Sequence, residues 1–211
     1  MINESALARP LIVYIHGFCC SPASTKARLL VESLKTQPFL HQVWVPTLPF
    51  GPEQAIDLLW PRLQQESQQK PVYLIGSSLG GYYGTWLYQQ LSQQYQKSKS
   101  VYEAKLVLIN PAVRPYEMMA DYLGEHNNYY TGEQYILTQE HVNQLKALQV
   151  SAITNPDNCL LLVQTGDETL DYRKAVDYYQ ASPTQIIPGG NHGFEGFAEY
   201  LPQIYKFFGL L

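Results

Sequence analysis

Cysteine is scarce in this sequence: the 211 residues include three, at Cys19, Cys20 and Cys159. An odd number with two adjacent members does not make a disulfide framework, and the spacing does not match that of zinc ligands. We therefore expect reduced thiols in a loop and in a core strand. We expect no cofactor and no metal.

Charged residues are also few, at 15% of the chain, and the formal net charge is −4. The 14 Lys and Arg residues are scattered and form no basic cluster, which argues against a nucleic-acid partner. Long apolar runs are missing as well. The segment 1–10 lacks the positively charged start of a signal peptide, and every later apolar run is too short to span a bilayer. We expect a cytoplasmic protein with no membrane partner.

What the chain does contain is a series of short apolar runs that alternate with helical patterns. The first, Leu11–Ile15, is apolar throughout, which is typical of a strand buried on both faces of a parallel sheet. Further strands are expected at 43–45, 72–75, 106–109, 159–163 and 184–187. Six strands alternating with helices predict an α/β fold, a three-layer α/β/α sandwich with a mostly parallel sheet, in a single domain over residues 1–211.

The pattern changes between residues 111 and 150, which we expect to leave the sheet as an insertion. Two helical patterns, around 116–123 and 139–149, flank a polar stretch. The segment is rich in tyrosine, whose ring can face a pocket while its hydroxyl meets water. We therefore predict a small helical lid, with Tyr129 and Tyr130 as substrate-binding candidates. An amphipathic helical pair that covers an edge of the sheet would give the same pattern.

The sequence between the third strand and the next helix reads Gly76-Ser-Ser78-Leu-Gly80. A serine acts as a nucleophile when its hydroxyl is exposed beside a base and near backbone N–H donors, and a sharp strand-to-helix turn provides both conditions. Side chains larger than glycine at Gly76, Gly80 or Gly81 would collide with the neighbouring strand or the incoming helix. Ser78 is therefore the candidate nucleophile.

Two further residues at strand ends complete the order Ser78, Asp167, His192, which is the order of nucleophile, acid and base in α/β-hydrolases. Ser78 needs a base to take its proton, and His192 needs a carboxylate to fix its tautomer. The position after Gly166 favours Asp167 as the acid, but Glu168 and Asp171 lie close by. Asp171 also suits the start of a helix. A metal site built from these three acids is a weaker interpretation, because no histidine joins them.

An acyl-transfer site also needs donors for the oxyanion that forms on the substrate. The backbone N–H groups of Phe18, after the first strand, and of Leu79, after the candidate nucleophile, are expected to meet there. His16 precedes this loop and is expected to be structural. Arg114 lies just beyond a strand end and is a substrate-binding candidate for an acidic group, although a surface ion pair would explain it equally well.

Four stretches carry a resemblance to a known family. They are Gly76-Ser-Ser-Leu-Gly-Gly-Tyr-Tyr83, Asn110-Pro-Ala-Val-Arg-Pro115, Gly166-Asp-Glu168 with Leu170-Asp-Tyr172, and Gly189-Gly-Asn-His192. The chain resembles the α/β-hydrolase superfamily along nearly its whole length, and more closely the small bacterial esterases of the YqiA type. The resemblance implies an α/β-hydrolase fold and a cytoplasmic carboxylic-ester hydrolase acting on short acyl esters. We expect the two leading strands of larger hydrolases to be absent from this sheet.

The sequence thus favours a serine esterase that hydrolyses a small-molecule ester through an acyl-enzyme on Ser78. A thioesterase or a perhydrolase would use the same three residues. A non-catalytic α/β-hydrolase-fold protein that binds a ligand or another protein is the alternative from a different class. The sequence pattern does not indicate an oligomeric state.

Overall fold

The computed structural model describes residues 8–18, 20–35, 42–127, 132 and 134–211. Six strands form one sheet: β1 (Leu11–Ile15), β2 (Gln42–Trp44), β3 (Val72–Ser77), β4 (Ala104–Ile109), β7 (Cys159–Gln164) and β8 (Thr184–Ile187). Their spatial order is β2-β1-β3-β4-β7-β8, and every neighbouring pair is parallel. The carboxyl ends of all six strands therefore lie at the same edge of the sheet.

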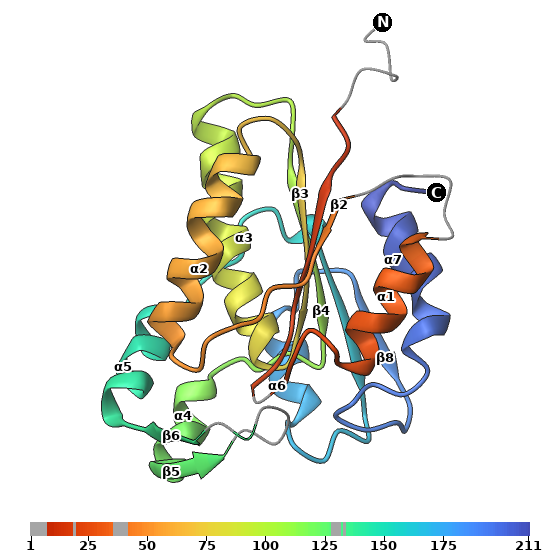
Figure 1. Ribbon diagram of the computed structural model, residues 1–211. Coiled ribbons are helices and arrows are strands. Elements are labelled where there is room, and N and C mark those ends of the chain that lie inside the picture. Colours follow the sequence, from red (N-terminus) through yellow and green to blue (C-terminus); the bar gives the residue numbers. More distant parts are fainter. Residues whose placement is uncertain (1–7, 19, 36–41, 128–131, 133) are drawn as a thin grey trace, which may run out of the picture.

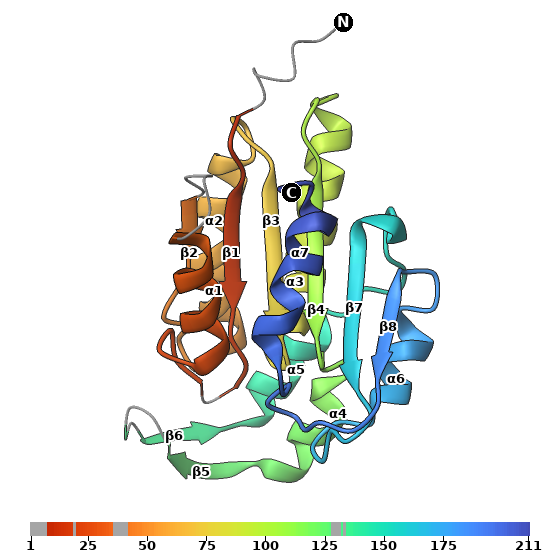
Figure 2. The same ribbon diagram turned by 90° about the vertical axis from the view of Figure 1, so that its right-hand side faces the viewer.

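Helices cover both faces of the sheet and make the three predicted layers (Figures 1 and 2). The helices are α1 (Thr25–Lys35), α2 (Pro52–Glu66), α3 (Leu79–Lys97), α4 (Pro115–Met119), α5 (Gln139–Ala147), α6 (Tyr172–Tyr178) and α7 (Phe197–Phe208), with short 3-10 turns at Ala120–Tyr122 and Pro156–Asn158. None of the helices in the described part of the chain is both long and apolar enough to cross a membrane.

The continuous apolar run of β1 is explained by these two covered faces. Leu11, Val13 and Ile15 pack in the core with α2, α3 and α6, whereas Ile12 and Tyr14 pack in the core with α1 and α7. Successive strand residues point to opposite faces, so a strand between two helical layers needs apolar side chains at every position. The predicted fold class is confirmed.

The insertion between β4 and β7 differs in part from the expectation. Its two helical segments are present, but the polar stretch between them contains an antiparallel hairpin of β5 (Gly124–Asn127) and β6 (Gln134–Leu137). Helix α5 packs against α2 and α4. The hairpin lies beyond the carboxyl ends of the sheet strands (Figures 1 and 2). The insertion therefore stands at the edge where the candidate site lies.

Candidate active site

The candidate site is centred on Ser78, which separates β3 from α3. Its backbone has φ 55° and ψ −124°, a conformation that L-residues rarely adopt. The turn is tight on both sides: a Cβ at Gly80 would lie 2.0 Å from the carbonyl oxygen of Ile15. Neighbouring chain also holds the turn, because the Ser78 N–H donates to the Ile109 carbonyl at 3.1 Å and the Ala112 N–H donates to the Ser78 carbonyl at 3.1 Å.

Ser78, His192 and Asp167 form a continuous chain of hydrogen bonds. Nε2 of His192 lies 3.0 Å from Oγ of Ser78, and Nδ1 lies 2.9 Å from Oδ2 and 3.0 Å from Oδ1 of Asp167. Ser78 follows β3, Asp167 follows β7 and His192 follows β8. The parallel sheet brings the carboxyl ends of these three strands to one edge. The imidazole is 23% exposed and the carboxylate 1% exposed. The carboxylate is thus shielded from water, while the ring still reaches the surface of the site.

The Asp167 carboxylate is held in its ionised form by several donors. Burial alone would raise the pKa of Asp167, but the hydrogen bond with His192 and the N–H groups of Leu170 and Thr169 outweigh burial and lower the pKa from its ordinary value. These two N–H groups donate to Oδ1 at 2.8 and 2.9 Å. Asp167 can therefore accept the Nδ1–H of His192, which leaves Nε2 free to face Ser78.

The two neighbouring acids occupy different positions. Asp171 is the N-cap of α6, where Oδ1 accepts from the backbone N–H of Arg173 at 3.0 Å and from its guanidinium at 3.3 Å. Glu168 is exposed, and its Oε2 accepts the backbone N–H of His192 at 2.9 Å. Of the three acids weighed from the sequence, Asp167 is the one that contacts the imidazole of His192. Among the described residues, no group of three His, Cys, Asp or Glu side chains could hold a metal ion.

A cavity of about 470 Å³ is lined by Ser78, His192, Phe18 and Lys26, among other residues. Leu79, the other expected oxyanion donor, is the first residue of α3. The N–H of a first helical residue has no acceptor within its own helix. Phe18 and Leu79 thus come from two separate segments, the loop after β1 and the start of α3, and Phe18 lines the same cavity as Ser78.

His16 stands beside this cavity but is buried, with 4% of its surface exposed. Its Nδ1 lies 3.0 Å from the Gly17 carbonyl, and its Nε2 accepts the Leu48 N–H at 3.4 Å. Burial lowers the pKa of His16, with the backbone hydrogen bond to Gly17 acting in the opposite direction. A ring that starts from an ordinary pKa near 6.5 is then neutral at pH 7 and ties the loop after β1 to the chain around Leu48.

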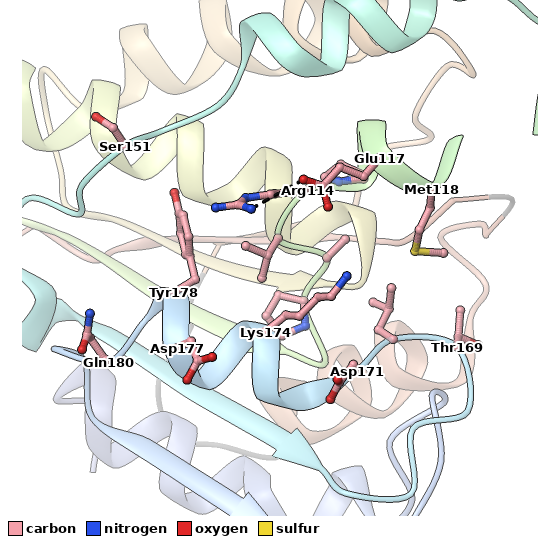
Figure 3. A pocket seen from close by; sticks show the side chains of 15 residues that line it. Arg114, Glu117, Met118, Ser151, Thr169, Asp171, Lys174, Asp177, Tyr178 and Gln180 are labelled. Atoms are coloured by element: carbon pink, nitrogen blue, oxygen red, sulfur yellow. Dashed lines mark ion pairs between the residues drawn. The ribbon is translucent and has the colours of Figure 1, made fainter. Parts of the chain in front are cut away.

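Arg114 lies in a second cavity, of about 560 Å³, between α4 and α6. Figure 3 shows its guanidinium between Glu117 and Tyr178. Nη1 of Arg114 is 3.5 Å from Oε1 of Glu117, and the Arg114 side chain is 55% exposed. The structure therefore places Arg114 in a surface ion pair, in a cavity whose lining does not include Ser78. Tyr129 and Tyr130 fall outside the described residues.

The insertion reaches the candidate oxyanion loop through another tyrosine. The ring of Tyr135, in β6, stacks on Phe50 with 3.8 Å between centroids. It also meets the ring of Phe18 edge-on, with 5.8 Å between centroids. Because Phe18 lines the cavity that contains Ser78, Tyr135 supports one wall of that cavity from outside.

Two residues that were not among the predicted site residues hold the segment that carries His192. Asn110 follows β4 and Gln164 ends β7, and both are buried, with 3% and 2% of their surfaces exposed. Their side chains bind the backbone of residues 191–195. The available signal is a carboxamide directly after or at the end of a run of four or more apolar strand residues, 106–109 and 159–163, because a buried polar side chain needs a partner.

Comparison with solved structures gives the same fold at low sequence identity. Est1E from Butyrivibrio proteoclasticus matches with a TM-score of 0.71 and 16% identity, over 96% of this chain and 87% of that chain. Alpha/beta hydrolase domain-containing protein 10 from mouse matches with a TM-score of 0.68 and 16% identity, over 99% and 97%. The esterase domain of a Rhodothermus marinus protein matches with a TM-score of 0.65 and 16% identity, over 96% and 88%. The chain thus has the α/β-hydrolase fold.

The sequence profile of one family covers nearly the whole chain. It matches residues 11–209, from the first strand to the end of the last helix. The match spans every segment that carries the candidate site. This chain, which has the α/β-hydrolase fold, therefore belongs to the family described as Uncharacterised protein family (UPF0227).

Proposed function

We propose that this protein is a serine esterase that hydrolyses short-chain carboxylic esters of small molecules. The observation that carries the proposal is the hydrogen-bonded chain from Ser78 Oγ through His192 to Asp167. A nucleophile, a base and an orienting carboxylate in this order activate a hydroxyl that is otherwise almost un-ionised at neutral pH.

In the first half of the reaction, Ser78 Oγ attacks the ester carbonyl carbon while its proton passes to Nε2 of His192. The resulting oxyanion is stabilised by the N–H groups of Phe18 and Leu79, and losing one such donor typically costs about 3–4 kcal/mol of transition-state stabilisation. The bond to the alcohol oxygen then breaks, and His192 gives the proton to the departing alcohol. The product of this half is an acyl ester on Ser78.

In the second half, His192 removes a proton from water as the water oxygen attacks the acyl carbon. A second oxyanion forms at the same position and collapses, which releases the carboxylic acid and returns the proton to Ser78. Asp167 stays ionised throughout and stabilises the imidazolium, in keeping with the donors that lower its pKa. The structural neighbour named as an esterase domain adds support for the ester class.

The preference for short acyl groups is proposed from the aromatic side chains around Ser78 rather than from the cavity volume alone. The cavity has a volume of about 470 Å³, and Tyr14 and Phe18 contribute aromatic side chains to its wall. Contact between Phe18 and Tyr135 of the insertion limits how far that wall can move. Because overfilling a packed pocket costs free energy, longer chains should be excluded progressively.

The test is hydrolysis of p-nitrophenyl acetate and p-nitrophenyl butyrate by the purified protein and by its Ser78→Ala variant. The proposal predicts turnover by the first protein and a loss of kcat on the order of 10⁶ in the variant, with the fold intact. A Ser78→Ala variant that kept more than about a tenth of the activity would remove Ser78 from the reaction, since tenfold corresponds to only about 1.4 kcal/mol.

A further inference from the structure

The segment that carries His192 is irregular. Residues 191–195 lie in the connection between β8 and α7 and belong to neither element. Phe194 has φ 61° and is 2% exposed, so an unusual backbone conformation is held in a buried place. Helix α7 begins only at Phe197, three residues further on. Without strand neighbours, this segment needs other partners for its backbone N–H and C=O groups.

Asn110 supplies two of these partners. Its Nδ2 donates to the Asn191 carbonyl at 3.0 Å and to the His192 carbonyl at 3.3 Å. Its Oδ1 accepts the backbone N–H of Gln164 at 2.9 Å. The side chain therefore ties the end of β4 to both β7 and the residue that faces Ser78.

Gln164 supplies three more. Its Oε1 accepts the N–H groups of Asn191 at 3.1 Å and Glu195 at 2.9 Å, and its Nε2 donates to the Glu195 carbonyl at 2.8 Å. The loop is pressed close to this carboxamide: a Cβ at Gly190 would lie 2.1 Å from Oε1. Gln164 therefore binds the segment at both of its ends.

We propose that Asn110 and Gln164 form a carboxamide clamp that positions His192 for proton transfer with Ser78. The inference rests on the proposed serine esterase function. Neither side chain contacts Ser78 Oγ or the imidazole through a recorded hydrogen bond, so both act through the backbone of the loop. They are positioning residues.

The physical basis of the clamp is the cost of moving the loop. Displacing residues 191–195 would leave two buried carboxamides and their backbone partners without hydrogen bonds, and a buried polar group that loses its partner destabilises the folded state. A fixed loop keeps Nε2 of His192 at 3.0 Å from Oγ of Ser78. Misplacement by about 1 Å at a reacting group can reduce the rate on the order of 100-fold.

Two other side chains bind the same loop from its exposed side. Nζ of Lys26 donates to the Gly193 carbonyl at 2.8 Å, and Glu168 accepts the His192 N–H at 2.9 Å. Both contacts are exposed and involve charged side chains with many alternative rotamers. The buried carboxamides are therefore the stronger determinants of where His192 lies.

The test compares Gln164→Met with Gln89→Met as a matched control. Gln89 also binds a loop with its carboxamide, through Thr154 Oγ1 at 2.6 Å and the Thr154 N–H at 3.0 Å. This loop precedes β7, so it lies at the edge of the sheet opposite to the candidate site. Both variants should lower the melting temperature. Only Gln164→Met should lower kcat for p-nitrophenyl butyrate, on the order of 100-fold, with KM nearly unchanged.

A conservative variant and a readout without turnover complete the experiment. Gln164→Glu keeps acceptors for the N–H groups of Asn191 and Glu195 and, once burial keeps its carboxyl group protonated, a donor to the Glu195 carbonyl. It should therefore retain more activity than Gln164→Met, most clearly at the acidic end of the assay range, and it carries the test if Gln164→Met does not fold. Hydrogen exchange of the segment 191–195 should become faster in Gln164→Met and stay unchanged in Gln89→Met.

The outcomes separate the two proposals. If Gln164→Met has only a lower melting temperature and keeps kcat within about twofold, as Gln89→Met should, the proposed role of the clamp is wrong and the esterase proposal stands. If the unsubstituted protein neither hydrolyses the ester nor reacts with a fluorophosphonate at Ser78, the esterase proposal fails, and the catalytic role of the clamp fails with it. Unchanged hydrogen exchange in a folded Gln164→Met would refute the clamp on its own.

Discussion

Both carboxylate oxygens of Asp167 face Nδ1 of His192, at 2.9 and 3.0 Å. This arrangement fixes the tautomer in which Nδ1 carries the proton and Nε2 accepts one from Ser78. Asn in place of Asp167 keeps the shape but can present an amide N–H to Nδ1, which favours the wrong tautomer. Asp167→Asn should therefore lower kcat on the order of 10⁴ on a short ester, measured under saturating substrate.

Asp171→Asn provides the matched control, because the same chemical change is made four residues away at a helix N-cap. Asparagine caps helices about as well as aspartate, so stability should change by less than about 1 kcal/mol and activity by less than about tenfold. Parallel assays and urea unfolding of the two variants check this. If Asp171→Asn were the inactive protein and Asp167→Asn the active one, the acid would be misassigned.

The lowered pKa of Asp167 predicts a particular dependence of stability on pH. A carboxyl group with a folded-state pKa below its ordinary value of 3.8 stabilises the folded protein above that value, and the contribution is lost as the pH falls through the folded-state pKa. Urea unfolding between neutral pH and about pH 3 measures this effect. The stability difference between the unsubstituted protein and Asp167→Asn should shrink at the acidic end, and a constant difference would contradict the assigned pKa direction.

The contact between Tyr135 and Phe18 predicts an effect on acyl-chain length. Activity should fall beyond roughly four to six acyl carbons, with about 1–3 kcal/mol for each misfit methylene. Tyr135→Ala should relax this limit, because the Phe18 wall then loses its outer support. Ile136→Ala is the control, since its side chain neighbours Tyr135 in β6 but is 57% exposed. Better turnover of a long ester than of the butyrate by the unsubstituted protein would contradict a restricted cavity.

The sheet and its helices could be predicted because their signals are local. Apolar runs such as Leu11–Ile15 mark strands that are covered on both faces, and the short Ser78 turn has its own glycine pattern. Ser78, Asp167 and His192 could be proposed together because parallel strands bring their carboxyl ends to one edge. Their distances required the structure.

The hairpin could not be predicted because its sequence carries no strand periodicity. Gly124–Asn127 has no alternation of apolar and polar residues, and β6 is fixed by contacts of Tyr135 with Phe18 and Phe50, which are remote in sequence. The parts played by Asn110 and Gln164 were missed for a related reason. A single carboxamide at a strand end says nothing of the loop that the fold brings beside it.

The role of Ser78 as nucleophile is tested by the reaction of the purified protein with a fluorophosphonate, followed by mass spectrometry of the intact protein and of its peptides. A serine is phosphonylated when its hydroxyl is activated by a base. We expect one adduct per chain, located on Ser78, with loss of ester hydrolysis in proportion to labelling and with much slower labelling of His192→Ala. Hydrolysis that persists after Ser78 is fully labelled, or an adduct on another residue, would contradict the assignment of Ser78 as the nucleophile.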